Sequence, residues 1–364
     1  MKKLFILLLL CPFLLLSQNG QKDIISLIKE NSNDTSLTLS NTSIDSLLVT
    51  NSIDSIKLDL FTMFYNVENL FDTINNLNTN DESFLPNSKK KWDTHKYNHK
   101  LQQLAKVFSN IKKDVNNDKL PDIIGLCEIE NKLVINDLLK DSVFNNHNYI
   151  IIHKESPDYR GIDCALLFNN KFKLLKHDFI EVNLTNNQRP TRDIVYAQLQ
   201  FHDMIINVFV NHWPSRWGGQ KETNNKRVQA ALVLKNYIKK NTSNDEYSII
   251  MGDFNDYPHN ESLKEVLIQD NFVNLMETDE VLGLGSYNYK GLWNWLDQII
   301  ISTNFLNNNS EFNLIYGGSF QKDFMLYTNK QGETYPSRSF GGDNWYGGFS
   351  DHLPIYSRIV FKLN

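Results

Sequence analysis

The sequence predicts an α/β (α+β) fold in which mixed β-sheets are covered by helices. Short apolar runs, typical of buried strands, recur from Leu58 to near the C-terminus. Helical patterns lie between only some of these runs, so strands and helices do not alternate as they would around a purely parallel sheet. Apolar residues make up 41% of the chain and charged residues 22%, which suits a buried core and excludes collagen, coiled coil and wholesale disorder.

The first residues have the pattern of a secretory signal. Lys2 and Lys3 precede an apolar run, residues 4–16, which is too short for a comfortable membrane span. We therefore assign residues 1–18 to a signal peptide and expect an exported protein (periplasmic, cell-surface or secreted), in preference to an uncleaved anchor. The mature chain is then expected to have no stable membrane span.

The next segment differs from the rest of the chain. Residues 19–56 are rich in Asn, Ser, Thr and Asp and poor in aromatic residues, which predicts a disordered tether, with a mild amphipathic helix near 23–29 as an alternative for part of it. From residue 58 the composition becomes globular and stays so. We expect residues 57–364 to form one domain that carries the functional site.

The expected strands are apolar runs bounded by polar or turn-forming residues. In chain order they are 58–65, 123–126, 164–168, 194–199, 205–210, 248–251, 298–302 and 355–361. The expected helices, where apolar residues recur at helical spacing, are 94–111, 226–240 and 263–269. The first begins after Asp93 and the third follows a capping region at Asn260 and Ser262.

Polar side chains follow or precede six of these strands directly. They are Asn66 and Glu68, Glu128, His212, Asp253 and Asn255, Asp297, and Asp351 and His352. Polar groups beside buried backbone are costly unless they meet in one solvated cleft or around an ion. We therefore expect these strand ends to converge on a single site.

The donor atoms of these residues indicate which ion the site prefers. The carboxylates and amides offer only oxygen, which suits Mg²⁺, with Mn²⁺ or Ca²⁺ as alternatives. His212 and His352 are isolated in sequence, and Cys127 and Cys164 lack partners at zinc-site spacing. The two cysteines are better interpreted as small buried hydrophobes, which can be neighbours in space. An oxygen-ligated divalent ion together with two histidines suits phosphoryl chemistry.

Six motifs carry a resemblance to a known family. They are YNVENLFD (65–72), GLCEIEN (125–131), VNHWPSR (210–216), MGDFND (251–256), WLDQIIIS (295–302) and SDHLPIY (350–356). In this order they resemble the endonuclease/exonuclease/phosphatase superfamily, the deoxyribonuclease I-like fold, and in detail its exported bacterial members. The resemblance implies a four-layer sandwich: two mixed, mostly antiparallel sheets packed face to face and flanked by helices.

The resemblance also implies roles for the residues at the strand ends. Glu128 would be the principal metal ligand with Glu68 beside it, Asp351 would complete the metal or phosphate cluster, and Asp253 would activate water or hold a second ion. Whether one or two metal ions act stays open.

The remaining site residues would act on the substrate. Asn66 and Asn255 would hydrogen-bond the scissile phosphate or its water. Asp297 would fix the tautomer of His352, which would act as a base or a cationic phosphate clamp, while His212 would be the general acid.

Several other residues allow two interpretations. Arg192 either resembles a phosphate-contacting arginine of the family or is a solvated arginine at the start of a strand. Asp163 either orients His212 or caps a turn. His95 and His99 have a zinc-binding spacing but no visible third ligand. Two basic clusters either contact a nucleic-acid backbone or are solvated surface: Lys89 to Lys91, and Lys221 with Lys226 and Arg227. The tryptophans beside the motifs either stack on bases or sugars or seal the edge of the core: 213, 217, 293, 295 and 345.

The function we expect is metal-dependent phosphodiester hydrolysis by an endonuclease acting on DNA or RNA through in-line water attack. The formal net charge of −5 does not indicate a nucleic-acid binder, but a bound metal ion supplies local positive charge. The alternative is a phosphatase or phosphodiesterase acting on phospholipid headgroups or small phosphate esters. A binding module without activity is disfavoured because every motif keeps its carboxylates and histidines. We expect a monomer without a protein partner.

Overall fold

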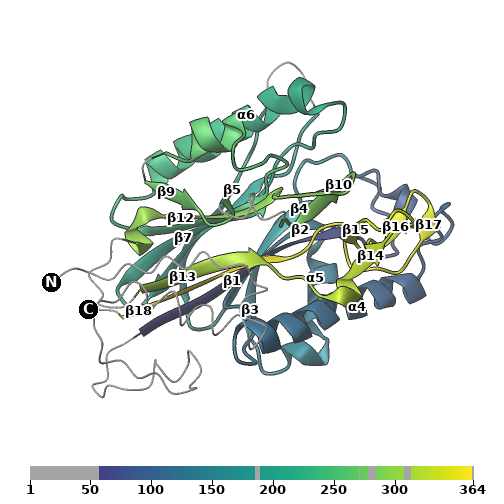
Figure 1. The fold of residues 1–364 in the computed structure, drawn as a ribbon, viewed down its shortest axis with the longest axis horizontal. Helices are drawn as coiled ribbons and strands as arrows, with labels where there is room; N and C mark the ends of the chain where they lie inside the picture. Colours follow the sequence, from purple (N-terminus) through teal and green to yellow (C-terminus); the bar gives the residue numbers. More distant parts are fainter. Residues whose placement is uncertain (1–56, 185–188, 270, 278–283, 307–312, 363–364) are drawn as a thin grey trace.

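Two six-stranded sheets lie face to face at the centre of the structure (Figure 1). The computed structural model describes residues 57–184, 189–269, 271–277, 284–306 and 313–362. The expected signal peptide and tether lie outside the described residues. Each sheet contains one parallel pair of strands, and its other pairs are antiparallel.

The first sheet has the order β13-β18-β1-β2-β4-β3. Its strands are β13 (Asn313–Ser319), β18 (Ile355–Lys362), β1 (Lys57–Leu70), β2 (Ile123–Ile129), β4 (Asp163–Asn169) and β3 (Tyr149–His153). The parallel pair is β1 with β2. Cys127 of β2 lies directly opposite Cys164 of β4, and both thiols are free and buried, so the two cysteines are neighbours.

The second sheet has the order β5-β6-β7-β8-β12-β9. Its strands are β5 (Lys173–Ile180), β6 (Ile194–Phe201), β7 (Met204–His212), β8 (Tyr247–Asp253), β12 (Asp297–Ser302) and β9 (Phe272–Asn274). The parallel pair here is β7 with β8. The two sheets therefore share a plan, a central parallel pair flanked by antiparallel neighbours.

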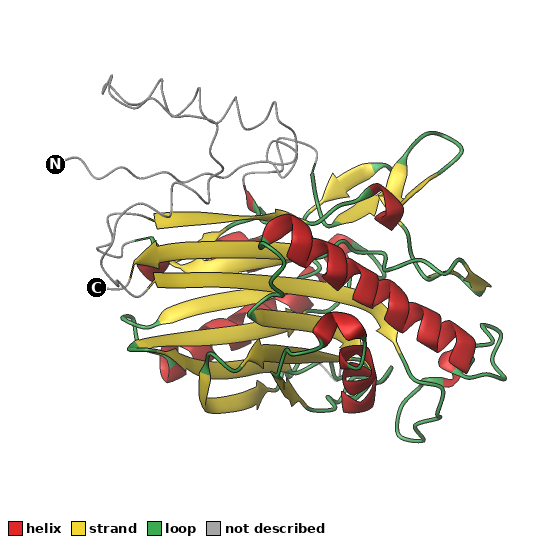
Figure 2. Ribbon diagram, turned by 90° about the horizontal axis from the view of Figure 1, so that it is seen from below, coloured by secondary structure: helices red, strands yellow, loops and turns green. Residues whose placement is uncertain are grey.

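Helices cover the outer face of each sheet and complete four layers. The helices α4 (Thr94–Val115) and α5 (Lys132–Leu139) pack on the first sheet, and α6 (Gln220–Asn241) packs on the second. Figure 2, seen from below, shows the long helix α4 crossing the strands of the first sheet. This is the four-layer sandwich that the motifs implied, and the fold prediction is confirmed.

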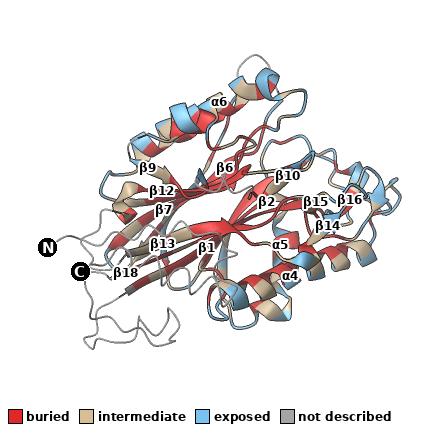
Figure 3. Cartoon of the chain, in the orientation of Figure 1, coloured by how far each residue is buried: buried red, intermediate tan, exposed pale blue. Residues whose placement is uncertain are grey.

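The apolar runs of the sequence are explained by burial on both faces of the central strands, seen as buried ribbons in Figure 3. In β1, Leu60 and Phe64 face the other sheet, whereas Phe61 and Met63 face α4. Successive side chains of a strand point to opposite faces, so a strand between two cores must be apolar throughout. Burial of this kind is why the central strands could be located from sequence.

The edge strands, the short helices and the helix boundaries were predicted less accurately. The strands β3, β5 and β13 and the helix α5 were not expected. Strand β5 is largely exposed and carries a weak apolar pattern, whereas β3, with three consecutive isoleucines, and α5 carry apolar patterns that the prediction missed. Helix α6 begins at Gln220, six residues before the expected start. The expected helix 263–269 is a short π-helical segment, η3 (Ser262–Leu267).

Three two-stranded hairpins lie outside the large sheets. They are β10 (Tyr287–Tyr289) with β11 (Leu292–Asn294), β14 (Leu326–Thr328) with β15 (Thr334–Pro336), and β16 (Phe340–Gly341) with β17 (Asn344–Trp345). The last of these, together with the 3₁₀ turn η1 (Glu82–Phe84), packs around Trp92 and Phe340. Within the described part of the chain, every helix is too short or too polar to cross a bilayer.

Candidate functional site

The polar strand ends meet at one edge of the sandwich. The parallel pairs β1–β2 and β7–β8 end there, and the antiparallel neighbours β12 and β18 begin there. In the second sheet, His212, Asp253 and Asp297 lie side by side, because His212 pairs with Asp253 and Asp253 pairs with Asp297 in the strand register. The predicted convergence of these residues is therefore present.

Irregular backbone marks the ends of β1 and β2 at this edge. The register of β1 with β2 shifts between Asn66 and Leu70, and that of β2 with β4 shifts between Cys127 and Ile129. Glu68 and Glu128 lie in these irregularities with φ angles of 51° and 61°, and Asn255 has a φ of 50°. Left-handed backbone at non-glycine residues is costly and clusters at functional sites. A bulge of this kind re-aims a side chain that would otherwise point into the core.

Asn66 joins the two sheets at the centre of the site. Its Nδ2 donates to Oδ2 of Asp253 at 3.1 Å, and its Oδ1 accepts from the backbone N–H of Glu68 at 3.0 Å. The carboxylate of Glu128 is fixed nearby, because its Oε2 accepts from the backbone N–H of Asn69 at 2.9 Å. The side-chain amide of Asn66 therefore connects Asp253 of the second sheet with the backbone of Glu68 in the first sheet.

Glu68 is surrounded by donors that the sequence did not reveal. Its Oε2 accepts from the backbone N–H of Ser339 at 2.6 Å and lies 3.9 Å from Nζ of Lys100. Its Oε1 accepts from Nε of Arg338 at 3.3 Å, and Nη2 of the same arginine bonds Asp351 at 3.1 Å. Arg338 thus links the two carboxylates that were predicted to share a cation.

Burial sets the protonation of this cluster. Burial, and then the charge of Asp351, raises the pKa of Glu68, although Lys100 opposes the shift. Burial lowers the pKa of Lys100 to about 8, although Glu68 opposes that shift. Lys100 was detectable as a lysine in line with Leu104 and Phe108 on the apolar face of α4. Arg338 and Ser339 lie in a long irregular segment without such a pattern.

His352 and Asp297 form a buried dyad. Nδ1 of His352 lies 2.7 Å from Oδ2 of Asp297, which also accepts from the hydroxyl of Ser286 at 2.5 Å. Burial lowers the pKa of His352, but the charges of Asp297 and Asp253 outweigh it and raise the pKa well above its usual value. His352 is therefore cationic near pH 7, which favours the phosphate-clamp role over the base role.

Asp253 has the properties of a base. Its Oδ1 accepts from the backbone N–H of Asn255 at 2.9 Å, and its Oδ2 lies 3.8 Å from Nε2 of His352 and 3.7 Å from Nε2 of His212. Burial raises its pKa to about 7, with His352 opposing and Asp297 adding to the shift. A group that titrates near the working pH is suited to accept a proton from water.

His212 does not fit the general-acid role expected for it. Burial and the nearby charges of Arg192 and Arg160 lower its pKa well below the usual value, so the ring is neutral near pH 7. Asp163 does not orient it either, because that carboxylate bonds Nε2 of His153 at 3.2 Å and the backbone N–H of Ser156 at 2.7 Å. A neutral ring can still donate a hydrogen bond.

Arg192 is buried and not solvated. It is 5% exposed, its Nη1 bonds Oδ2 of Asp158 at 3.0 Å, and its Nη2 donates to the carbonyl of Trp213 at 2.6 Å. The side-chain amide of Asn255 donates to the same carbonyl at 3.1 Å. These bonds hold the backbone that follows His212, and the phosphate contact of Arg192 stays a prediction.

The other residues singled out earlier divide between structure and surface. Nε2 of His99 bonds the carbonyl of Gly347 at 2.9 Å, so His95 and His99 do not form a zinc site. Arg227 is buried in an ion pair with Asp256 and does not belong to a basic surface cluster. Trp295 is buried, whereas Trp217 is 89% exposed.

The carboxylates at this edge fit a divalent cation. Glu68, Glu128 and Asp351 offer oxygen atoms, and the charge of Asp351 that helps to raise the pKa of Glu68 is a repulsion that a cation relieves. Within the described residues, one group of His and carboxylate ligand atoms lies within 4.8 Å of one another, that of Asp253, Asp297 and His352. Because His352 is cationic and bonded to Asp297, we interpret this trio as catalytic groups rather than as the primary metal site.

Comparisons with known proteins agree with this fold. Residues 61–360 match the profile of the Endonuclease/Exonuclease/phosphatase family. None of the curated proteins compared with the sequence matches it. A family protein from Bacteroides thetaiotaomicron aligns with a TM-score of 0.53 and 15% identity, over 85% of this chain and 100% of its own.

Two further solved structures are similar at the same identity. D. rerio TDP2, complexed with a single strand DNA product, has a TM-score of 0.51 and 15% identity, over 83% of this chain and 98% of its own. A mannosyl-6-phosphatase from Bacteroides thetaiotaomicron has a TM-score of 0.51 and 15% identity, over 82% of this chain and 99% of its own. At this identity the likeness establishes the shared fold.

Proposed function

The chain belongs to the endonuclease/exonuclease/phosphatase family, a family of phosphoester hydrolases, and on that premise we propose that it is an exported, metal-dependent endonuclease acting on DNA or RNA. The observation that carries the catalytic part is the position of Asp253, a carboxylate with a pKa of about 7 between a cationic and a neutral histidine. Export is supported by the signal-like residues 1–18.

The mechanism we propose is in-line attack of water on phosphorus. Asp253 takes a proton from the water as the new P–O bond forms. The opposite P–O bond breaks and releases an alkoxide, which takes its proton from solvent. His352, held cationic by Asp297, attracts the equatorial phosphate oxygens, and His212 donates a hydrogen bond to them. A divalent ion held by Glu68, Glu128 and Asp351 would neutralise the phosphate charge. We favour Mg²⁺ because all three ligands supply oxygen.

The choice of nucleic acid rests on two supports. The surface next to Glu68 carries Lys90 and Arg338, which add local positive charge to an otherwise acidic protein. The fold is also that of TDP2, which was solved with a DNA product. The second candidate is hydrolysis of small phosphate esters, because the fold is equally that of a mannosyl-6-phosphatase.

The test uses the chain without residues 1–18. It is incubated with supercoiled plasmid, linear duplex, single-stranded DNA, RNA and a hexose 6-phosphate, each with Mg²⁺, Mn²⁺ or a chelator. His352→Ala is run beside the exposed control His177→Ala. Metal-dependent nicking that His352→Ala abolishes and His177→Ala keeps supports the proposal. Release of inorganic phosphate from the sugar phosphate, with every nucleic acid intact, would replace it by the second candidate.

A further inference from the structure

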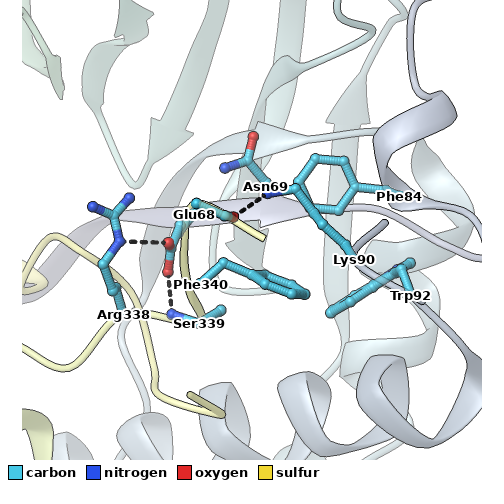
Figure 4. Close-up of a pocket in the computed structure, with 9 residues that line it drawn as sticks. Glu68, Asn69, Phe84, Lys90, Trp92, Arg338, Ser339 and Phe340 are labelled. Carbon is cyan, nitrogen blue, oxygen red and sulfur yellow. Dashed lines mark hydrogen bonds and ion pairs between the residues drawn. The ribbon is translucent and has the colours of Figure 1, made fainter. Parts of the chain in front are cut away.

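A cavity of about 170 Å³ opens beside Glu68 (Figure 4). Residues from three separate segments line it: Glu68 from β1, Phe84, Lys90 and Trp92 from the loop before α4, and Arg338 and Phe340 from the segment around β16. The cavity is far larger than the space one water needs, about 10–15 Å³. The lining therefore combines a predicted metal ligand, three aromatic rings and two cationic side chains with the smaller residues Asn69, Ser339 and Gly342.

The aromatic wall is rigid. Phe84 stacks on Phe71 with ring centroids 4.4 Å apart, and Trp92 packs on Phe340 at 5.8 Å. Nε1 of Trp92 donates to the carbonyls of Phe71 and of Asp72, at 3.1 and 2.9 Å. Rings held in this way provide an apolar surface for a flat group at little conformational cost.

The cationic groups lie at the rim of the same cavity. Nζ of Lys90 lies 4.7 Å from the ring centroid of Phe340 and 5.2 Å from that of Phe84, and it donates to the carbonyl of Gly342 at 2.9 Å. The side chain of Arg338 is 49% exposed while it bonds Glu68. Two cations beside a predicted metal ligand favour an anion that is part of the same substrate.

We propose that this cavity binds the nucleotide adjacent to the scissile phosphate. Its base displaces the ammonium group of Lys90 from the rings of Phe340 and Phe84 and packs on them, and the phosphate contacts Lys90 and Arg338. A base inside such a cavity has left its own stack, so the preferred substrate is single-stranded. The inference rests on the proposed function, and it adds the substrate class and the residues that select it.

The shared chemistry is a flat ring joined to a phosphate, which a sugar phosphate also offers in a less planar form. A nucleobase matches the aromatic wall better because both of its faces are π-surfaces. Dinucleotides test the assignment cleanly, since each contains a single scissile phosphodiester. We would use thymidine dinucleotides with and without a terminal phosphate, and the same compounds with one nucleoside replaced by an abasic spacer.

The variants are Phe340→Leu, which keeps an apolar core residue, and Lys90→Gln, with Lys239→Gln at the exposed end of α6 as a charge-matched control. In the wild type, one of the two spacer positions should lower kcat/KM about tenfold. In Phe340→Leu the same spacer should lower kcat/KM less than about threefold. The reason is that this variant lacks the ring on which the base would have packed. Lys90→Gln should likewise reduce the benefit of the terminal phosphate, and Lys239→Gln should leave both effects unchanged.

Each outcome decides between the two proposals. The subsite is overturned if the spacer lowers kcat/KM equally in the wild type and Phe340→Leu, and if the terminal phosphate raises it equally in the wild type and Lys90→Gln. The nuclease proposal would still stand. Hydrolysis of a hexose 6-phosphate without cleavage of any dinucleotide overturns both. Thermal unfolding of each variant shows whether it is folded. If Phe340→Leu does not fold, Lys90→Gln alone tests the subsite.

Discussion

The Asp297→Asn substitution keeps the size of the side chain and removes the charge that holds His352 cationic. It weakens a buried 2.7 Å hydrogen bond to a charged ring. Hydrogen bonds to charged groups contribute about 1.5–3 kcal/mol. If that energy acts in the transition state, kcat should fall about 10- to 150-fold, with a much smaller change in KM, because the fold and the metal ligands are unchanged.

The same substitution has a predictable effect on stability against pH. In the metal-free wild type the folded-state pKa of His352 is raised, so its stabilisation is fully present below the unfolded pKa of about 6.5 and is lost as pH rises through the folded pKa. One proton changes the free energy of unfolding by at most about 1.4 kcal/mol per pH unit. In Asp297→Asn the decline with pH should be shallower, because the charge that raised the pKa is absent.

Two measurements check this prediction. Steady-state kinetics with plasmid or the best small ester gives kcat, and urea unfolding in chelator from pH 5 to 9 gives the slope. The control is Asp118→Asn, an equal charge change at a side chain that is 67% exposed. A kcat within threefold of the wild type, or an unchanged slope with pH, would refute the dyad as described.

Three further predictions follow from the same geometry. His212→Ala should lower kcat about 100-fold, as for loss of one transition-state donor, without moving the alkaline limb of the pH–rate profile; movement of that limb would show that His212 supplies a proton. Mg²⁺ at 100 times its Kd should raise the free energy of unfolding by about 2.7 kcal/mol in the wild type and not in Glu128→Gln, measured by calorimetry; an equal rise in both would place the ion elsewhere. Arg227→Met should destabilise the protein by about 1.5–3 kcal/mol in urea, because it removes the 2.8 Å partner of the buried Asp256 and leaves Arg216, at 3.2 Å, as the remaining cation; a loss below about 0.5 kcal/mol would contradict this.

The central strands and the site residues on them were predictable for one physical reason. A strand buried on both faces is apolar along its length, so a carboxylate or imidazole at its end is conspicuous. Asp253 after β8 and Glu128 near the end of β2 are examples. The parallel pairing of β1 with β2 then brings Asn66 and Glu128 to the same edge.

The groups that tune the site were not predictable in the same way. Arg338 and Ser339 reach Glu68 from about 270 residues away in the chain, through a segment of hairpins without a periodic pattern. The neutral state of His212 depends on burial and on Arg192, which only the three-dimensional arrangement reveals. Sequence therefore located the reacting groups, whereas their protonation and support follow from packing.

The convergence of six separate strand ends determines when the site forms during folding. Contacts between distant segments, such as Asn66 with Asp253, form late because a long loop must close first. Neither sheet alone contains Glu128, Asp253 and His352 together. A chain that is still being synthesised, or that is crossing a membrane unfolded, therefore carries no working part of the site, and chemical activity begins only when the two halves dock.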